Sequence, residues 1–252
     1  MTWVLLRGLT REARHWGDFP LQLQEATGHS PGEAITLDLP GNGKWCGQRS
    51  PLSVEEMVEA VRRQLAAQCV RPPYAVLAMS LGGMAAASWA QRYPEEISRL
   101  VLVNTSIRPH AHFAQRLRPR SWLPLLAMAA HWRNTDAVEQ KVHELTCRRQ
   151  EQRQQDLTQW RFIRQSAPVS AANAARQLWA ATRFTCAPLA PRCPVLVLSS
   201  AGDALVSPAC SAQLARAWQT SHREHPWAGH DLPHDDPRWV CQHVALWDDA
   251  CT

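Results

Sequence analysis

The sequence predicts an α/β fold in which a mostly parallel sheet is flanked by helices and interrupted by an inserted helical cap. Short apolar runs alternate with helical patterns at the spacing of strand-helix-strand crossovers, which pair strands in parallel. The strand-like runs then disappear over residues 105–191, where the chain is helix-prone and rich in Arg and Gln. A length of 252 residues suits one α/β domain with a modest insertion.

The strands are expected at short apolar runs that end in turns or loops. These runs cover residues 2–7, 34–39, 74–78, 100–103, 195–199 and 221–225. Because these runs are absent between residues 105 and 191, we expect residues 1–104 and 192–252 to form the core and residues 105–191 to form the cap segment.

Helices are expected after residue 53 and over residues 82–92, 208–218 and 237–250. Ser53 has the place of the first helix's N-cap, and Glu56 follows in the capping-box position. The apolar residues of that helix keep helical spacing and predict one buried stripe, made of Val54, Met57, Val58, Val61 and Leu65.

Composition excludes several classes of protein. The chain is 45% apolar and 19% charged, which excludes the disordered and fibrous classes. No window approaches the roughly 18 apolar residues of a membrane span. The first residues lack the pattern of a secretory signal, so a cytoplasmic protein is expected. Eight cysteines without a CxxC pair or zinc-type Cys/His spacing predict reduced thiols and no metal site, and no Gly-rich motif indicates a cofactor.

Positive charge gathers in the cap segment. Residues 108–183 hold thirteen Arg or Lys against five acids, a balance of +8 in a chain whose net charge is +5. Three interpretations stay open: a solvated face, attraction of a small anionic ester, or docking of an acidic acyl carrier protein. A nucleic-acid partner is not expected, because no base-reading or stacking motif accompanies the charge.

The segment AMSLGG, residues 78–83, follows an expected strand and begins an expected helix, as a nucleophile elbow does. The elbow needs small residues two positions before and after its serine, and Ala78 and Gly82 meet this need. Such a turn lifts Ser80 above the sheet and aims the N–H of Leu81 at a developing oxyanion. The alternative interpretation is that Ser80 only caps the helix.

A serine nucleophile needs a base, and the base needs a third group to orient it. Asp203 follows the expected strand 195–199, and His230 comes soon after the last expected strand. Both would therefore project from the carboxyl edge of the sheet, as Ser80 does. Asp231, adjacent to His230, is expected to point elsewhere. The remaining acids and histidines nearby are interpreted as caps of the last helix or as surface residues: Asp235, Asp236, His222, His225 and His234.

These three motifs, in this order, resemble the α/β-hydrolase superfamily over essentially the whole chain. The segment DLPGNG, residues 38–43, is similar to the D-x-P-G-x-G loop of that family. The resemblance implies Ser80, Asp203 and His230 as catalytic triad. It also implies Leu9 N–H as the second oxyanion donor beside Leu81, although Arg7 stands where the family usually has His.

Within the superfamily, the SLGG elbow and the Arg-bearing cap are similar to pimeloyl-acyl-carrier-protein methyl ester esterases. The resemblance implies hydrolysis of a small-molecule ester or of an ester or thioester linked to an acyl carrier protein. Met79, Trp122, Arg148 and Arg149 are the expected substrate-binding residues. A carboxylesterase is the first hypothesis, and a non-catalytic binding protein on a hydrolase scaffold stays open.

Overall fold

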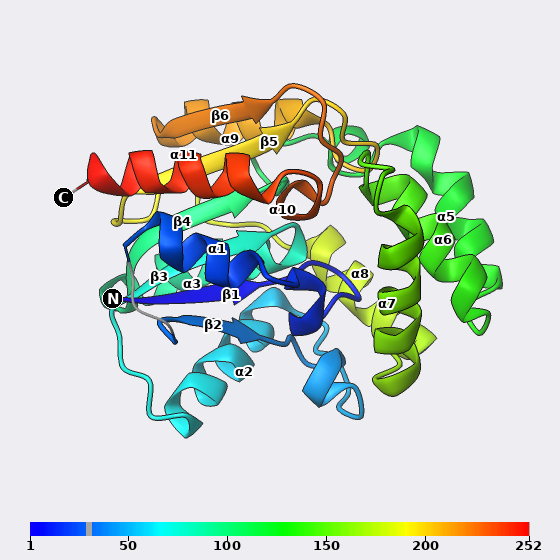
Figure 1. Ribbon diagram of the computed structural model, residues 1–252. Coiled ribbons are helices and arrows are strands. Elements are labelled where there is room, and N and C mark those ends of the chain that lie inside the picture. Colours follow the sequence, from blue (N-terminus) through cyan, green and yellow to red (C-terminus); the bar gives the residue numbers. More distant parts are fainter. Residues whose placement is uncertain (29–31, 252) are drawn as a thin grey trace.

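The computed structural model describes residues 1–28 and 32–251, which form a sheet with helices on both faces (Figure 1). The strands in this part of the chain are β1 (Thr2–Leu6), β2 (Ala34–Leu37), β3 (Tyr74–Met79), β4 (Ile97–Val103), β5 (Val195–Ser200) and β6 (Ser221–His225). They form one sheet in the order β2-β1-β3-β4-β5-β6, and every neighbouring pair is parallel. The predicted α/β fold with a parallel sheet is confirmed.

The helices divide into those that cover the sheet and those of the cap segment. The covering helices are α1 (Phe19–Ala26), α2 (Val54–Ala67), α3 (Leu81–Arg92), α9 (Pro208–Trp218), α10 (Leu232–Asp235) and α11 (Pro237–Asp249). The cap helices are α4 (Phe113–Arg116), α5 (Trp122–Ala130), α6 (Thr135–Thr146), α7 (Arg153–Ser166) and α8 (Ala171–Arg183). Short 3-10 turns lie at Ala13–Trp16, Gly43–Trp45, Pro94–Glu96 and Pro119–Ser121.

Each face of the sheet has its own apolar core, because successive side chains of a strand point to opposite faces. Val76 and Leu100 belong to the core under α2, α3 and α9. Leu77 and Val101 belong to the core under α1 and α11. Figure 1 shows α1 and α11 side by side on the near face of the sheet.

Local sequence accounts for the start and the buried face of α2. The Ser53 side chain accepts the N–H of Glu56 at 3.2 Å, as an N-cap residue does. The expected stripe from Val54 to Leu65 is at most 1% exposed, so this prediction is confirmed. Helix α1 was not predicted, because its sequence FPLQLQEA carries too few apolar residues to show a clear helical period.

The cap helices lie between β4 and β5 in the chain and stand beyond the carboxyl ends of the strands, at the right of Figure 1. The carboxyl edge of a parallel sheet is where ligands of open α/β folds bind. Within residues 1–28 and 32–251, none of the helices has the length and apolar content that crossing a membrane requires.

Candidate active site

Ser80 lies at a sharp turn between β3 and α3. Its φ of 53° and ψ of −119° belong to a region that residues with a side chain rarely adopt. A Cβ at position 82 would lie 2.5 Å from the carbonyl oxygen of Arg7 and 2.7 Å from that of Leu6, so only Gly82 fits. The Ser80 side chain caps none of the described N–H groups of α3. This geometry is that of a nucleophile elbow and differs from that of a simple helix cap.

Asp203 and His230 are joined by a hydrogen bond of 2.7 Å between Oδ2 and Nδ1. Asp203 is 1% exposed, and its Oδ1 accepts the N–H groups of Leu205 at 2.8 Å and Val206 at 2.9 Å. These bonds fix the carboxylate with its second oxygen toward the imidazole. The side-chain amide of Asn104 donates to the carbonyl oxygen of His230 at 2.8 Å and holds the histidine loop.

The surroundings of His230 set its protonation. Burial by itself lowers the pKa of His230, because it penalises the charged imidazolium. The negative charges of Asp203 and Asp231 outweigh burial, so the pKa of His230 lies above its ordinary value, while Arg7 opposes the rise. With Nδ1 bonded to Asp203, Nε2 is the nitrogen left to accept a proton.

Ser80 and His230 line the same cavity, whose volume is about 110 Å³. Its core side includes Leu9 and Met79, and its opposite wall comes from α5 and α6 of the cap segment. The apolar residues of that wall are Leu125, Met128, Val142 and Leu145. No hydrogen bond between the Ser80 hydroxyl and the His230 ring is among those of the described residues, so proton transfer between them belongs to the proposal below.

Arg7, the departure from the family pattern, is buried beside the histidine loop. Its guanidinium forms a two-point ion pair with Asp231, with Nη1 3.0 Å from Oδ1 and Nη2 on Oδ2. It also lies over the Trp16 ring, 4.7 Å from the centroid. Burial raises the pKa of Asp231, but Arg7 outweighs it and holds that pKa below the ordinary range. The pair joins the loop after β1 to the loop that carries His230.

The two expected oxyanion donors lie next to Ser80. Leu81 is the first residue of α3, so its N–H has no acceptor within the helix. Leu9 lines the cavity from the loop after β1. A Cβ on Gly8 would stand 3.0 Å from the Ser80 Cβ, so glycine allows this loop to approach the serine closely. The position of both residues is compatible with donation to a substrate oxygen at Ser80.

Gln177 on α8, which the sequence did not single out, holds this same loop from the cap segment. Its Oε1 accepts the N–H of Thr10 at 2.9 Å, and its Nε2 donates to Asn42 at 2.8 Å and to Ser50 at 3.1 Å. The side chain is fully buried. Its partners come from three separate loops, so no local sequence signal could have found it.

Asp235 is a second connection between core and cap. Its carboxylate accepts the N–H groups of Gly229 at 2.6 Å, of Arg148 at 2.9 Å and of Arg149 at 3.0 Å. The expectation that it caps the last helix is wrong, because these three amides take up its oxygens. Asp236 alone caps α11, as expected.

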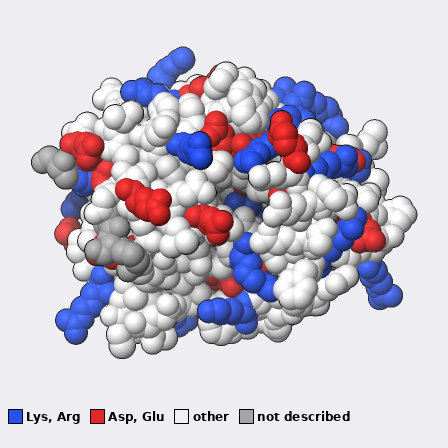
Figure 2. Space-filling model, viewed as in Figure 1, with Lys and Arg blue, Asp and Glu red and all other residues white. Residues whose placement is uncertain are grey.

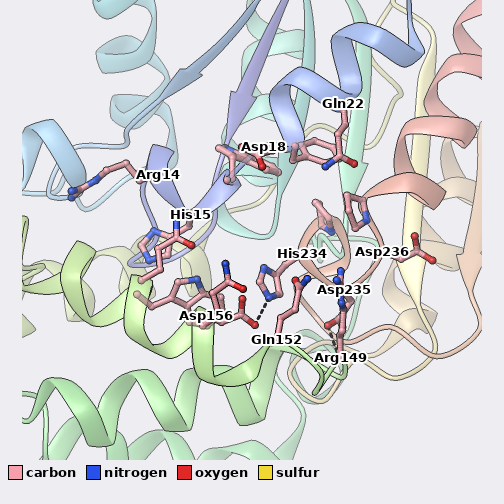
Figure 3. A pocket seen from close by; sticks show the side chains of 18 of the residues that line it. Arg14, His15, Asp18, Gln22, Arg149, Gln152, Asp156, His234, Asp235 and Asp236 are labelled. Atoms are coloured by element: carbon pink, nitrogen blue, oxygen red, sulfur yellow. Dashed lines mark hydrogen bonds and ion pairs between the residues drawn. The ribbon is translucent and has the colours of Figure 1, made fainter.

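The expected substrate-binding residues separate in space. Met79 lines the cavity of Ser80. Trp122 and Arg148 are not among the residues that line it: the Trp122 ring is 42% exposed, and Arg148 Nε donates to the carbonyl of Gly202 at 3.0 Å. Arg149 lines a second, polar cavity of about 670 Å³ between the core and α7 (Figure 3).

Of the histidines expected at the surface, His225 is buried and His234 is half-buried. His225 is 1% exposed, and its Nδ1 accepts the N–H of Ala228 at 3.0 Å, so that expectation is wrong. The Nε2 of His234 lies 3.0 Å from Oδ2 of Asp156 on α7, and both residues line the polar cavity (Figure 3). The sequence around each histidine did not predict the hydrogen bond that it forms in the structure.

The sequence model of the serine aminopeptidase S33 family, Hydrolase_4, matches residues 27–236. The chain belongs to this family of α/β hydrolases. The predicted membership of the α/β-hydrolase superfamily is therefore confirmed, and the parallel sheet agrees with it.

The hydrolase is similar to proteins of several activities. It is 34% identical over 103 residues to the biotin biosynthesis bifunctional protein BioHC of Teredinibacter turnerae, which is 41% of this chain and 17% of that protein. The enol-lactonase of Burkholderia xenovorans LB400 has a TM-score of 0.76 at 20% identity, over 98% of this chain and 91% of that one. A thermophilic esterase from Thermogutta terrifontis has a TM-score of 0.74 at 22% identity, over 100% of this chain and 91% of that one. The two structures show the hydrolase fold alone, and the BioHC match spans less than a fifth of its length.

Proposed function

We propose that this hydrolase cleaves carboxylic esters through an acyl-enzyme on Ser80. The observation that carries the proposal is the placement of Ser80, in a strained elbow, in one apolar cavity with His230, whose Nδ1 is bonded to Asp203. Nucleophile, base and orienting acid are the three groups that acyl transfer requires.

In the proposed reaction His230 Nε2 takes the proton of Ser80 as its Oγ attacks the ester carbonyl. The N–H groups of Leu9 and Leu81 donate to the oxyanion, each contributing about 3 kcal/mol of transition-state stabilisation. The protonated His230 then gives its proton to the alkoxide that leaves. Water, deprotonated by the same ring, releases the acid from Ser80 and restores the hydroxyl.

The size and lining of the cavity favour a short acyl group. Its volume is small, about 110 Å³. The apolar walls from α5 and α6 suit an aliphatic chain. Turnover of p-nitrophenyl esters is therefore expected to be highest near butyrate and to fall for octanoate.

Ser80→Ala tests the proposal directly. It is expected to reduce kcat for p-nitrophenyl butyrate by at least about 10³-fold, because the nucleophile is lost. A fluorophosphonate probe should label the wild-type serine and leave the variant unlabelled. Circular dichroism checks that the variant is folded.

Ser88→Ala is the matched control, because Ser88 is a buried serine on the same helix and does not line the cavity. It should keep both activity and labelling. Turnover that survives in Ser80→Ala would refute the mechanism. A wild-type protein that neither labels nor hydrolyses any ester of the series would instead indicate a binding protein on a hydrolase scaffold.

A second candidate is hydrolysis of an ester or thioester linked to an acidic acyl carrier protein. It is supported by the similarity to BioHC and by the +8 balance of residues 108–183. Figure 2 shows blue Lys and Arg side chains spread over the cap side of this face, at the right. A basic surface beside the cavity would attract a partner of opposite charge.

A further inference from the structure

A second group of chemically active side chains lies outside the cavity of Ser80, between the cap segment and the core. His143 and Cys147 come from the end of α6, Asp156 from α7 and His234 from α10. Ligand atoms of His143, Cys147 and His234 all lie within 4.8 Å of one another. Figure 3 shows His234 and Asp156 facing each other at the wall of the polar cavity.

The hydrogen bonds of this group leave imidazole nitrogens free for a ligand. Asp156 Oδ2 lies 3.2 Å from His143 Nε2 and 3.0 Å from His234 Nε2, so one carboxylate oxygen accepts from both rings. His143 is fully buried, and its Nδ1 has no hydrogen-bond partner among the described residues. A histidine that binds a metal commonly donates its other ring N–H to a carboxylate. Asp156 is the carboxylate that accepts these N–H groups here.

Helix geometry keeps His143 and Cys147 together. His143 lies in the last turn of α6, and Cys147, four residues later, is the residue that directly follows the helix. The N–H of Cys147 donates to the carbonyl of His143 at 2.8 Å, which fixes this turn. The thiol of Cys147 and the imidazole of His143 therefore both lie near His234, which belongs to the core.

One sulfur and two imidazole nitrogens form a donor set that suits zinc. Zinc bonds of about 2.0 to 2.3 Å place tetrahedral ligand atoms about 3.3 to 3.8 Å apart. One ligand atom from each of the three residues lies within 4.8 Å of the others, and Nδ1 is the nitrogen that remains for an ion when Nε2 of each ring donates to Asp156. The His234 side chain is 18% exposed and lines the polar cavity, so a water molecule can take the fourth position.

We propose that His143, Cys147 and His234 form a zinc site that joins the cap segment to the histidine loop. Asp156 orients both imidazoles by accepting their Nε2 protons, and the Cys147 thiol releases its proton to solvent when it binds the ion. The site differs from the sequence-based expectation of no metal, because its ligands come from distant segments and match no zinc spacing.

The position of the site gives the ion a structural role. His234 lies four residues after His230, and Thr146, the neighbour of Cys147, accepts the N–H of Asp231 at 2.8 Å. This hydrogen bond already holds the cap segment beside the loop that carries His230. A zinc ion would add a second connection between the same two segments. It binds the folded chain and stabilises the closed arrangement of cap and core.

Metal binding to the full chain tests this proposal without any measure of hydrolysis. After treatment with a chelator, the protein is titrated with Zn²⁺ in competition with a chromophoric chelator, and with Co²⁺ to detect thiolate charge-transfer absorption. One zinc per chain and a thiolate–cobalt band are expected. At zinc about 100-fold above its Kd, the melting temperature should rise by about 5 to 10 °C.

Variants identify the ligands. Cys147→Ser should abolish the thiolate–cobalt band and weaken zinc binding at least about 100-fold, and Asp156→Asn should weaken it about 10- to 100-fold. Cys241→Ser is the matched control, because Cys241 is a buried thiol on α11 outside the group. It should bind zinc as the wild type does. If Cys147→Ser does not fold, His234→Asn provides the same comparison at a half-buried position.

Two results would overturn the assignment. The first is a wild-type protein that gains no melting temperature with zinc and shows no thiolate–cobalt band. The second is a band and an affinity that persist unchanged in Cys147→Ser or His234→Asn, which would locate the metal at another cysteine. Either result would make His143, Asp156 and His234 a hydrogen-bonded packing group.

Discussion

Asp231 is next to the candidate base in the chain and also acts on it through its charge. It raises the pKa of His230, whereas its partner Arg7 lowers it. Removing one member of such a buried pair leaves the other charge uncompensated, at a cost of about 3 to 5 kcal/mol. Arg7, which stands where the sequence resemblance leads us to expect His, thus has its charge balanced by the residue after the candidate base.

Asp231→Asn is expected to move the acid limb of the pH profile of kcat/KM to lower pH. Hydrolysis needs neutral His230, so the rate falls as pH drops below the pKa of that ring. The substitution removes a negative charge that raises this pKa and leaves the opposing charge of Arg7 unpaired. Both effects lower the pKa. The profile is measured with p-nitrophenyl butyrate from about pH 5 to pH 9.

Asp248→Asn is the control for this experiment. Asp248 also pairs with an arginine, the half-buried Arg99, at 2.9 Å, but this pair lies near the start of β4, at the opposite end of the sheet from His230. Its pH profile should match the wild type. An acid limb that stays in place or rises in Asp231→Asn would show that Asp231 does not control the base.

At the scale of elements, α8 is the helix that supports the loop of Leu9, the proposed oxyanion donor. Its Gln177 holds the N–H of Thr10, one residue beyond Leu9, and anchors to Asn42 and Ser50 of the loops after β2. The cap segment therefore does more than cover the cavity. It holds in place the backbone that the proposed mechanism uses to stabilise the oxyanion.

Gln177→Leu is expected to lower both kcat and the melting temperature. The half-buried N–H of Thr10 loses its acceptor, at a cost of about 1 to 3 kcal/mol, or about 2 to 12 °C in melting temperature. Displacement of the neighbouring Leu9 N–H should reduce kcat more than it changes KM. Ester kinetics and thermal unfolding measure the two effects.

Gln91→Leu separates stability from catalysis. Gln91 on α3 likewise bonds backbone groups of the returning cap segment, at Ala187 and Leu189, but it does not line the cavity. It should lower the melting temperature and leave kcat unchanged. If Gln177→Leu behaved in the same way, α8 would have no part in positioning the oxyanion loop.

The sheet was predictable because strands buried on both faces are continuous apolar runs, as in VLVL at 195–198. Ser80, Asp203 and His230 could be proposed for a related reason: each follows a strand, and parallel strands end at one edge. The ion pair of Arg7 and Asp231 could not, because its members are separated by most of the chain. Distance along the chain likewise hid the ligands of the proposed zinc site.

Charge is a property of the whole molecule, and it bears on the carrier-protein hypothesis. If an acidic carrier protein docks on the cap, replacing Arg148 and Arg149 together by Glu should reduce kcat/KM for a carrier-linked ester at least about tenfold at low salt. Long-range attraction speeds encounter and is screened by salt, so the difference should shrink as salt rises. Turnover of p-nitrophenyl butyrate should change little, because neither residue lines the cavity of Ser80.

Replacing Arg63 and Arg71 together by Glu provides the control, since both are exposed arginines of the core and the change in net charge is the same. It changes the net charge without touching the cap. A loss with the carrier-linked ester that is equal in both proteins would point to net charge alone. If the cap variant keeps its kcat/KM for the carrier-linked ester, the arginines of the cap form only a solvated surface.

The wall opposite Ser80 has a consequence for how this hydrolase can diversify. Leu125, Met128, Val142 and Leu145 belong to α5 and α6, whereas the proposed reacting groups belong to loops of the core. Substitutions in those two helices can reshape the acyl site while leaving the bond-breaking groups and their supports in place. Libraries confined to these four positions should therefore yield new chain-length preferences more readily than libraries directed at the sheet.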